Sequence, residues 1–383
     1  MARVIVASHE VSSYPEGAGH FWVYMQYIQG LQRAGCEVYW LEQFHSDRDQ
    51  EAQHRAIATF LDRARSFGLE GRTLLYRADE RGAAAEWIGV SRTRAEATLR
   101  SADLLLNFHY EIHPSLLGLA RRTALVDIDP GLLQLWMSTE QLSVAQHDVY
   151  FTIGETVGTP QARFPDCGVR WLHIRPPVNL ELWPFAYDPD STAFTTVSGW
   201  WSGLFIKVVE NGQEVLRENT KRVAILPYAE LPHHTSQRLE LALHMSDDDV
   251  KERHMLEERG WSIRDALDIA GTPDSYRAYI QASRGEWAAA KPSCIRFQNA
   301  WVSDRTVCYL ASGKPVVVQD TGPSSYLPDG EGMFRFATLE EAAEAFEAVN
   351  ADYARQCRAA RDLAETHFDA HTILPSMLNE ALP

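Results

Sequence analysis

The alternation of two kinds of segment most constrains how this chain can fold. Short apolar runs rich in β-branched and aromatic residues alternate with longer segments of helical pattern. In the first half, strand-like runs cover residues 4–7, 38–41, 73–76, 104–108, 125–128, 149–153 and 169–174. Helical segments between them include 22–31, which Gly35 ends, and 52–67. Because such alternation is typical of parallel sheets covered by helices, the sequence predicts an α/β fold.

The alternation breaks at Arg175-Pro176-Pro177, because two prolines in a row do not fit a central strand. It resumes with predicted strands at 194–197, 223–226, 287–290 and 316–318. A chain of 383 residues also exceeds what one hydrophobic core usually serves. We therefore predict two Rossmann-like β/α/β domains facing a cleft, at residues 1–180 and 181–365. Residues 366–383 are predicted to form a helix that packs back toward the first domain.

Two segments of the second half resist assignment, 200–222 and 232–261. The run Asp247-Asp248-Asp249 in the latter is predicted to be solvated. Adjacent tryptophans on a strand point to opposite faces, so one of Trp200 and Trp201 is predicted to be in the core.

The charge balance excludes two classes of partner. With 52 acidic and 36 basic residues, the net charge of -16 repels nucleic acid and anionic membrane surfaces. The opening segment becomes polar after six residues, and no apolar run is long enough to span a bilayer. The sequence thus predicts a cytoplasmic protein with no integral membrane contact.

Cysteines and histidines give no metal or disulfide pattern. The five cysteines are widely spaced and form no Cys-x-x-Cys pair, so they are predicted to be buried thiols. His233-His234 and the pair His109 and His113 lack further ligands at a recognisable spacing, so no metal site is predicted.

Three stretches resemble the GT-B glycosyltransferases, which have two Rossmann-like domains, and especially the retaining family 4 group. Ile174 to Pro184 is similar to the passage that leaves the first domain of those enzymes. Residues 309–318 and the glycine-containing passage 320–334 resemble their Gly-x-Pro and Asp-Gly-x-x-Gly motifs. Residues 104–109 are similar to the strand that brings a histidine to the sugar site.

One departure from this group concerns its paired glutamates. The spacing from Gly313 places those positions at Ala300 and Cys308, so both carboxylates are missing. The second of them normally holds the ribose of the donor. Asp304, Asp320 and Glu286 are the candidates to replace it, and the spacing does not choose among them.

The resemblance implies a glycosyltransferase that moves a sugar from a nucleoside diphosphate donor to a small-molecule or saccharide acceptor, with no metal and no other cofactor. Ser303 is a good N-cap for a helix that Gly313 ends, and a helix N-terminus favours phosphate. The predicted donor-binding residues are Gly19, Ser303, Asp304, Arg305, Thr306, Lys314, Asp320, Gly322 and Glu286.

Three residues of the first domain are predicted to be catalytic: His20, His109 and Asp127. His20 follows Gly17-Ala18-Gly19, where the glycines allow a tight turn before a helix. A histidine there is suited to deprotonate the acceptor, because its pKa lies near neutrality. The resemblance implies a hydrogen bond from His109 to the transferred sugar. Asp127 ends a strand and is a candidate acceptor-side base.

Other functions are compatible with parts of the pattern. Gly17-x-Gly19 after a strand, with Glu42 ending the next strand, is the start of a dinucleotide-binding motif. Trp22 stands where that motif needs a small residue, which argues against an oxidoreductase. A nucleotide-sugar epimerase and a non-catalytic nucleotide-sugar-binding protein remain the alternatives.

Overall fold

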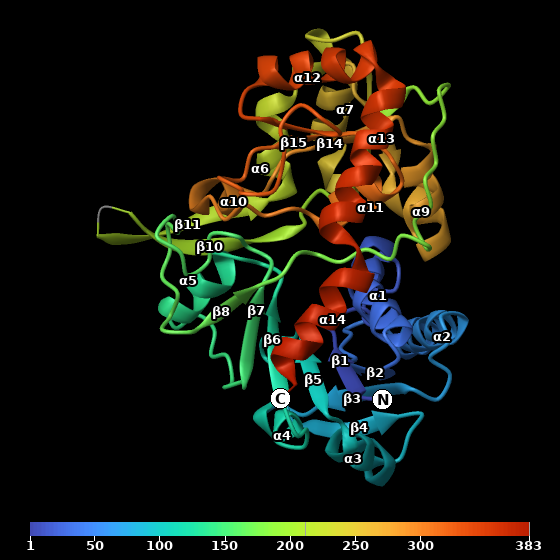
Figure 1. Ribbon diagram of the computed structural model, residues 1–383, viewed down its shortest axis with the longest axis vertical. Helices are drawn as coiled ribbons and strands as arrows, with labels where there is room; N and C mark the ends of the chain where they lie inside the picture. The colour runs from blue at the N-terminus through green and yellow to red at the C-terminus, as the bar shows by residue number, and fades with distance from the viewer. Residues whose placement is uncertain (211, 383) are drawn as a thin grey trace. The chain divides into compact units, whose positions relative to one another are not determined.

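A computed structural model describes residues 1–210 and 212–382, with backbone alone at 204, 209 and 210. The chain divides into two compact units. The first comprises residues 1–160, 164–179 and 369–383, and the second comprises 161–163 and 180–368. Each unit contains one large sheet with helices packed against it (Figure 1).

The sheet of the first unit has eight strands in the order β4-β3-β2-β1-β5-β6-β7-β8. All neighbours pair in parallel except β3 and β4. Apart from Arg3 at the start of β1, the central strands β1, β5 and β6 are buried, as expected where helices cover both faces. The strands are β1 (Arg3–Ala7), β2 (Glu37–Gln43), β3 (Thr73–Ala78), β4 (Ala84–Ile88), β5 (Leu104–Asn107), β6 (Thr123–Asp127), β7 (Val149–Thr152) and β8 (Trp171–His173).

The helices of this unit are α1 (Ala18–Arg33), α2 (Gln50–Ser66), α3 (Arg92–Ser101), α4 (Pro114–Leu117), α5 (Leu132–Ser138) and α14 (Ala370–Ala381). The last of these comes from the far end of the sequence and packs against α1 (Figure 1). Gly30 allows this close approach, because a Cβ there would lie 2.3 Å from a methyl of Leu374.

The second unit has a six-stranded parallel sheet in the order β13-β12-β9-β14-β15-β16. Its strands are β9 (Ala193–Gly199), β12 (Arg238–His244), β13 (Ser262–Asp265), β14 (Gly285–Ala288), β15 (Val316–Gln319) and β16 (Met333–Phe336). A separate antiparallel hairpin, β10 (Gly203–Glu210) and β11 (Gln213–Thr220), follows β9.

Several helices of the second unit pack against the strands of its sheet. They are α6 (Lys221–Ile225), α7 (Val250–Glu258), α8 (Ala266–Ala270), α9 (Pro273–Ala282), α10 (Pro292–Phe297), α11 (Asp304–Ala311), α12 (Leu339–Ala351) and α13 (Tyr353–Leu363). Short 3-10 turns lie at Leu226–Tyr228, Leu231–His233 and Asp247–Asp249, and one π-helical turn at Ala364–Phe368. The predicted caps are confirmed: Ser303 caps α11, and Thr338 with Glu341 forms a capping box on α12.

Three sequence predictions about this unit need comment. The strand predicted at 223–226 is wrong, because α6 and a 3-10 turn occupy that segment and bury Ala224 and Ile225. The aspartate run is not solvated throughout, since Asp249 accepts hydrogen bonds from Ser246 and is buried. The prediction for the tryptophan pair is confirmed: Trp200 is fully buried and Trp201 is 47% exposed.

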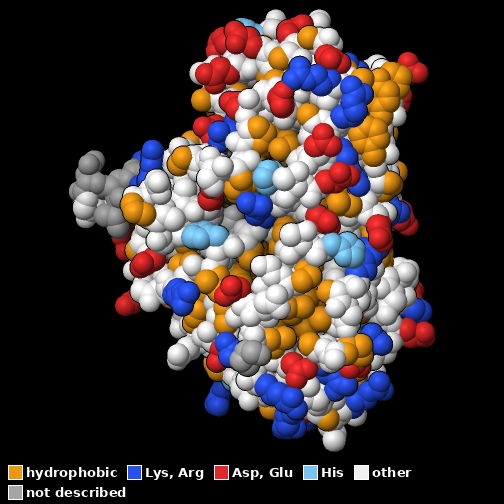
Figure 2. Space-filling model, in the orientation of Figure 1, with side chains coloured by type: hydrophobic (Ala, Val, Ile, Leu, Met, Phe, Trp, Pro, Cys, Tyr) orange, Lys and Arg blue, Asp and Glu red, His pale blue; other side chains and the backbone are white. Residues whose placement is uncertain are grey.

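Other properties of the described residues follow the sequence. All five cysteines are free, and four of them are buried. No helix in residues 1–210 or 212–382 is both long and apolar enough to cross a bilayer. Acidic and basic side chains are interspersed over the face that Figure 2 shows, so the net negative charge is not gathered in one patch of that face.

Candidate functional site

Each large sheet has one point where its strand order reverses. In the first unit this point lies between β1 and β5, and in the second between β9 and β14. Open α/β sheets bind ligands outside the carboxyl ends of the strands at this point. The polar residues that follow these four strands are therefore the first candidates for a site in each unit.

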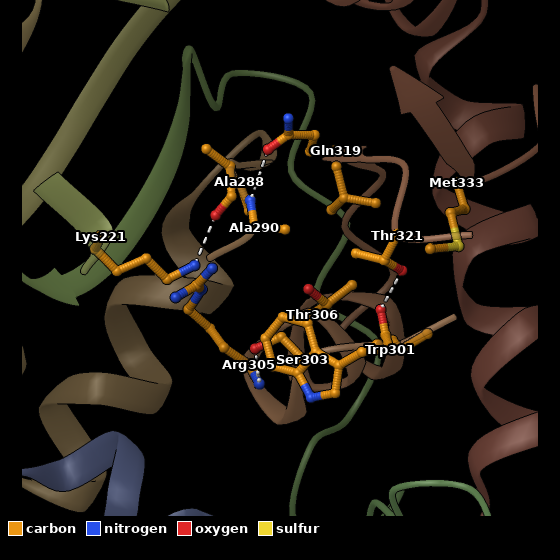
Figure 3. Close-up of a pocket in the computed structure, with 13 residues that line it drawn as sticks. Lys221, Ala288, Ala290, Trp301, Ser303, Arg305, Thr306, Gln319, Thr321 and Met333 are labelled. Carbon is orange, nitrogen blue, oxygen red and sulfur yellow. Dashed lines mark hydrogen bonds between the residues drawn. The ribbon is translucent and has the colours of Figure 1, made fainter. Parts of the chain in front are cut away.

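In the second unit, a small cavity lies at this edge of the sheet (Figure 3). The ends of β14 and β15, the first turn of α11 and the start of α6 form its walls. Its enclosed volume of about 20 Å³ has room for a water molecule, so a larger ligand would contact its rim. The polar lining residues are Lys221, Ser303, Arg305, Thr306, Gln319 and Thr321.

Arg305 extends from the first turn of α11 toward the sheet. Its Nε donates to Oε1 of Glu286 at 2.7 Å, and its Nη1 donates to the carbonyl oxygen of Val197 at 2.9 Å. Burial acts to lower the pKa of Arg305, but the carboxylate of Glu286 raises it, and the net shift is upward. Arg305 therefore lines the cavity as a permanently charged group held by Glu286.

Lys221 begins α6 and is also buried. Its Nζ donates to the carbonyl oxygen of Ala289 at 2.6 Å, just past the end of β14 (Figure 3). Burial, together with the charges of Arg305 and Lys291, lowers the pKa of Lys221 to about 7. An anion at the cavity would favour the protonated form of this amine.

The first turn of α11 contains the predicted residues Ser303, Asp304 and Thr306. The Oγ of Ser303 accepts from the backbone N–H of Arg305 at 3.3 Å, so it caps the helix. Thr306 is 2% exposed and lines the cavity, whereas Asp304 does not belong to its lining. Glu286 lies beneath the cavity and is completely buried.

Asp320 and Gly322 follow β15 but lie outside the cavity lining. Asp320 is paired with Arg335 at 3.2 Å and borders a second, open hollow beside α12. Gly322 has a φ of +130°, and a Cβ there would lie 2.6 Å from the carbonyl oxygen of Gln298. This glycine therefore allows the loop before α11 to lie close to the loop after β15.

The structure places Lys314 away from the other predicted donor-binding residues. Lys314 lies after the C-terminal end of α11 and just before β15, at the amino edge of the sheet. Its side chain is fully buried, and burial lowers its pKa to about 8. Helix α11 runs from the carboxyl edge to the amino edge of the sheet, so it separates Lys314 from Ser303.

The positions of the missing glutamates are both buried. Ala300 is 1% exposed, has a φ of +56°, and donates its N–H to the carbonyl oxygen of Thr321 at 3.0 Å. Cys308 is 3% exposed within α11. Neither residue carries a group that binds ribose hydroxyls as a carboxylate does.

In the first unit, two histidines meet at the switch point of the sheet. His9 follows β1 and His109 follows β5, and their rings stack with centroids 4.6 Å apart. His109 is 7% exposed, and burial lowers its pKa to about 3. The His9 side chain is 45% exposed and lies 3.6 Å from the carboxylate of Glu10. The neutral ring of His109 is thus covered by the more exposed ring of His9.

His20 belongs to the first turn of α1 and joins this cluster. Its Nε2 hydrogen-bonds to the carbonyl oxygen of His9 at 2.5 Å. Burial lowers the pKa of His20, although this hydrogen bond opposes the shift. Gly19 already belongs to helix α1, and Gly17 is the N-cap residue of that helix. The turn before the helix therefore ends at Gly17 and does not include Gly19.

Asp127 ends β6 and is completely buried. Its Oδ2 accepts from Gln134 Nε2 at 2.9 Å and Thr152 Oγ1 at 2.8 Å, and its Oδ1 accepts from the backbone N–H of Asp129. Burial raises its pKa to about 7. The structure thus gives this carboxylate three donors, which connect it to the loop after β6, to α5 and to the end of β7.

Two residues of these clusters were not predicted as site residues from the sequence: Lys221 and His9. His9 was detectable, because it lies two residues after the strand predicted at 4–7. Lys221 carried no local signal, since it reaches the cavity only through a helix that the sequence suggested was a strand. Among residues 1–210 and 212–382, no three His, Cys, Asp or Glu side chains form a group that could hold a metal ion.

No family model and no curated protein matches the sequence. Solved structures match over nearly the whole chain. HepE from Anabaena, in complex with UDP-glucose, has 15% identity and a TM-score of 0.59, with 99% of each chain covered. The pneumococcal O-GlcNAc transferase GtfA, with UDP and GlcNAc, has 8% identity and a TM-score of 0.57, covering 99% of this chain and 98% of its own.

AviGT4, a glycosyltransferase involved in avilamycin A biosynthesis, has 13% identity and a TM-score of 0.55. It covers 100% of this chain and 97% of its own. The chain therefore has the GT-B fold of two Rossmann-like domains.

Proposed function

We propose that this protein is a glycosyltransferase that takes a sugar from a nucleoside diphosphate donor without a metal ion. The donor is held by the second unit, and the acceptor, a small molecule or a saccharide, is held by the first. Several proteins of the same fold carry UDP or a UDP-sugar in their solved structures, which supports this class of donor.

The observation that carries the proposal is the charge at the cavity of the second unit. Arg305 brings a guanidinium cation to the switch point, and Lys221 brings an amine that an anion would protonate, whereas Glu286 pairs with Arg305. The N-terminus of α11 adds the partial positive charge of a helix dipole. These groups would stabilise the negative charge of a diphosphate leaving group bound along the rim of the cavity, and no metal ion would be needed.

On the acceptor side, the geometry of His20 suits a base. A carbonyl oxygen only accepts hydrogen bonds, so His20 Nε2 carries the proton toward His9 and Nδ1 keeps its lone pair. In the proposed step, the acceptor oxygen attacks the anomeric carbon while the bond from that carbon to the phosphate oxygen breaks. The diphosphate leaves with the electron pair, and the acceptor proton passes to Nδ1 of His20.

This step is a direct displacement and gives a product with inverted configuration. Proton NMR of the sugar freshly released from a UDP-sugar distinguishes inversion from retention. If the configuration of the sugar is retained, the acceptor proton passes to a group other than His20. His109 stays neutral in this scheme and supplies only a hydrogen bond to the sugar.

The proposal is tested by incubating the purified protein with UDP-, GDP- and dTDP-sugars. Thermal stabilisation by one nucleotide, with slow hydrolysis of its sugar, is the expected result. Formation of an epimer would support the epimerase alternative, and stabilisation without any turnover would support a binding protein. Absence of any response to all three nucleotides would rule out a nucleotide-sugar function.

A further inference from the structure

Glu42 is a buried carboxylate that the proposed reaction does not use. It lies near the end of β2, where a dinucleotide-binding protein would place the acid that contacts ribose. Its side chain is instead turned into the protein and is 1% exposed. A buried carboxylate needs hydrogen-bond donors to offset its desolvation, so the partners of Glu42 show what it does.

The carboxylate of Glu42 holds both ends of a short loop. Ser8, directly after β1, donates its hydroxyl to Oε2. Ser12 donates to Oε1 twice, from its backbone N–H at 3.1 Å and from its hydroxyl at 3.3 Å. Both serines are buried, at 1% and 0% exposure. Glu42 therefore joins the two ends of residues 8–12 with one side chain.

The residues inside this loop are His9, Glu10 and Val11. Glu10 has a φ of +61°, a left-handed conformation that non-glycine residues rarely adopt unless the surroundings hold them there. The carbonyl oxygen of His9 is the hydrogen-bond partner of His20 Nε2. The orientation of this carbonyl thus depends on a strained backbone that Glu42 holds from both sides.

We propose that Glu42 is a positioning residue for His20: by bonding Ser8 and Ser12 it fixes the His9 carbonyl, which in turn sets the tautomer and orientation of the His20 ring. This inference rests on the proposed function in giving His20 the role of base. The tautomer of His20, by contrast, is a property of the protein without substrate and can be measured whatever the function is. Glu42 acts only through the loop, because its contacts are with Ser8 and Ser12 and not with the ring.

Three variants separate this role from general support of the fold. Glu42→Ala removes the acceptor on both sides of the loop. Glu42→Gln keeps the shape, but its amide offers an accepting oxygen on one side only, so a serine that donates to the other side must turn its hydroxyl round to accept. Ser12→Ala removes a single hydroxyl and keeps the backbone contact, and serves where Glu42→Ala fails to fold. Glu37→Gln, on the same strand but in an ion pair with Arg3, is the matched control.

The first readout is the tautomer of His20, measured by long-range ¹⁵N–¹H NMR of histidine-labelled protein. The His20 signals are identified by their loss in His20→Gln. In the wild-type protein and in Glu37→Gln we expect a proton on Nε2 alone. In Glu42→Ala and Glu42→Gln we expect signals of both tautomers, and a smaller change in the same direction in Ser12→Ala.

The second readout is hydrolysis of the UDP-sugar that the wild-type protein turns over. We expect kcat to fall about 10- to 100-fold in Glu42→Ala, with the KM for the donor unchanged, because misplacing a catalytic group affects the chemical step. An unchanged tautomer in folded Glu42→Gln and Ser12→Ala would overturn the inference. So would a higher KM with an unchanged kcat.

The two readouts also separate failure of this inference from failure of the proposed function. If no nucleotide sugar is bound or hydrolysed, the proposed function fails, while the tautomer measurement still decides whether Glu42 orients His20. If the donor is hydrolysed and His20 keeps one tautomer in every variant, only the positioning role is lost.

Discussion

Arg305 and Glu286 form an ion pair inside the second unit, with Nε and Oε1 2.7 Å apart and side-chain exposures of 11% and 0%. The pair connects the first turn of α11 to β14, directly beneath the cavity. A substitution at either residue therefore changes the stability of the unit as well as the charge at the cavity.

Arg305→Ala is expected to lower the free energy of unfolding of the second unit by about 3–5 kcal/mol, because it leaves Glu286 charged and buried without its partner. Denaturant titration of the variant checks this loss. The double variant Arg305→Met with Glu286→Gln should recover most of the stability, since it removes both charges. It should still bind nucleotide sugar more weakly than the wild type, and wild-type affinity in this double variant would remove Arg305 from the donor site.

Lys221→Met is expected to weaken binding of the nucleoside diphosphate at least tenfold while leaving the stability equal or higher, since methionine avoids the cost of burying an amine. Isothermal titration with UDP gives the affinity, and thermal unfolding gives the stability. Lys207→Met, on the hairpin strand β10 and outside the cavity lining, is the control and should bind normally.

Binding of a diphosphate should also be coupled to proton uptake. Burial lowers the pKa of Lys221 to about 7, so the amine is largely neutral at pH 8, and an anion beside it raises that pKa. Titrations at pH 8 in buffers of different ionisation enthalpy should show uptake approaching one proton, and affinity should fall as pH rises from 7 to 9. Proton uptake that persists in Lys221→Met would assign it to another group.

The stability of the first unit should fall as pH rises from 5 to 8. Burial raises the pKa of Glu42 and of Asp127 to about 7, above their ordinary values. Each group therefore stabilises the fold below its unfolded pKa, and this contribution is lost as pH rises through about 7, at roughly 1.4 kcal/mol per pKa unit. Thermal unfolding of the wild type, Glu42→Gln and Asp127→Asn at pH 5 and pH 8 checks this. Each variant should show a smaller difference in stability between the two pH values than the wild type does.

Gly30→Leu is expected to destabilise the first unit by several kcal/mol, because even a Cβ at this position would lie 2.3 Å from Leu374. Gly30→Ala should have a smaller effect, since the glycine-to-alanine change favours a helix and partly offsets the clash. Circular dichroism melts of both variants measure the effect. Equal melting temperatures for the three proteins would show that α14 does not need this close approach.

Local signals predicted much of the fold. The strands and helices around Ser303, Gly313 and Thr338 were predictable because caps and stop signals act within a few residues. The hairpin β10–β11 was missed even though Gly212, with a φ of +77°, stands between two strand-forming runs. The strand predicted at 223–226 failed because tertiary packing of Ala224 and Ile225 in a helix outweighed the β-propensity of Val223 and Ile225.

The candidate site was less predictable, because its groups meet only through the sheet topology. Ser303, Arg305, Thr306 and Glu286 were predicted, and the structure brings them to one edge of the second sheet. Lys314 lies at the opposite edge from Ser303, because helix α11 stands between them, and sequence distance alone does not show this. The roles of Glu42 and Lys221 depend on partners 30 or more residues away, which no local pattern encodes.

The docking of α14 on α1 has a consequence for the order of biosynthesis. The segment that completes the first unit, Asp369–Pro383, lies downstream of the entire second unit. On the ribosome, residues 180–368 therefore emerge and can assemble before the N-terminal sheet has its last helix. Until then, the apolar surface around Gly30 stays uncovered, and the nascent chain carries an incomplete N-terminal half throughout most of its translation.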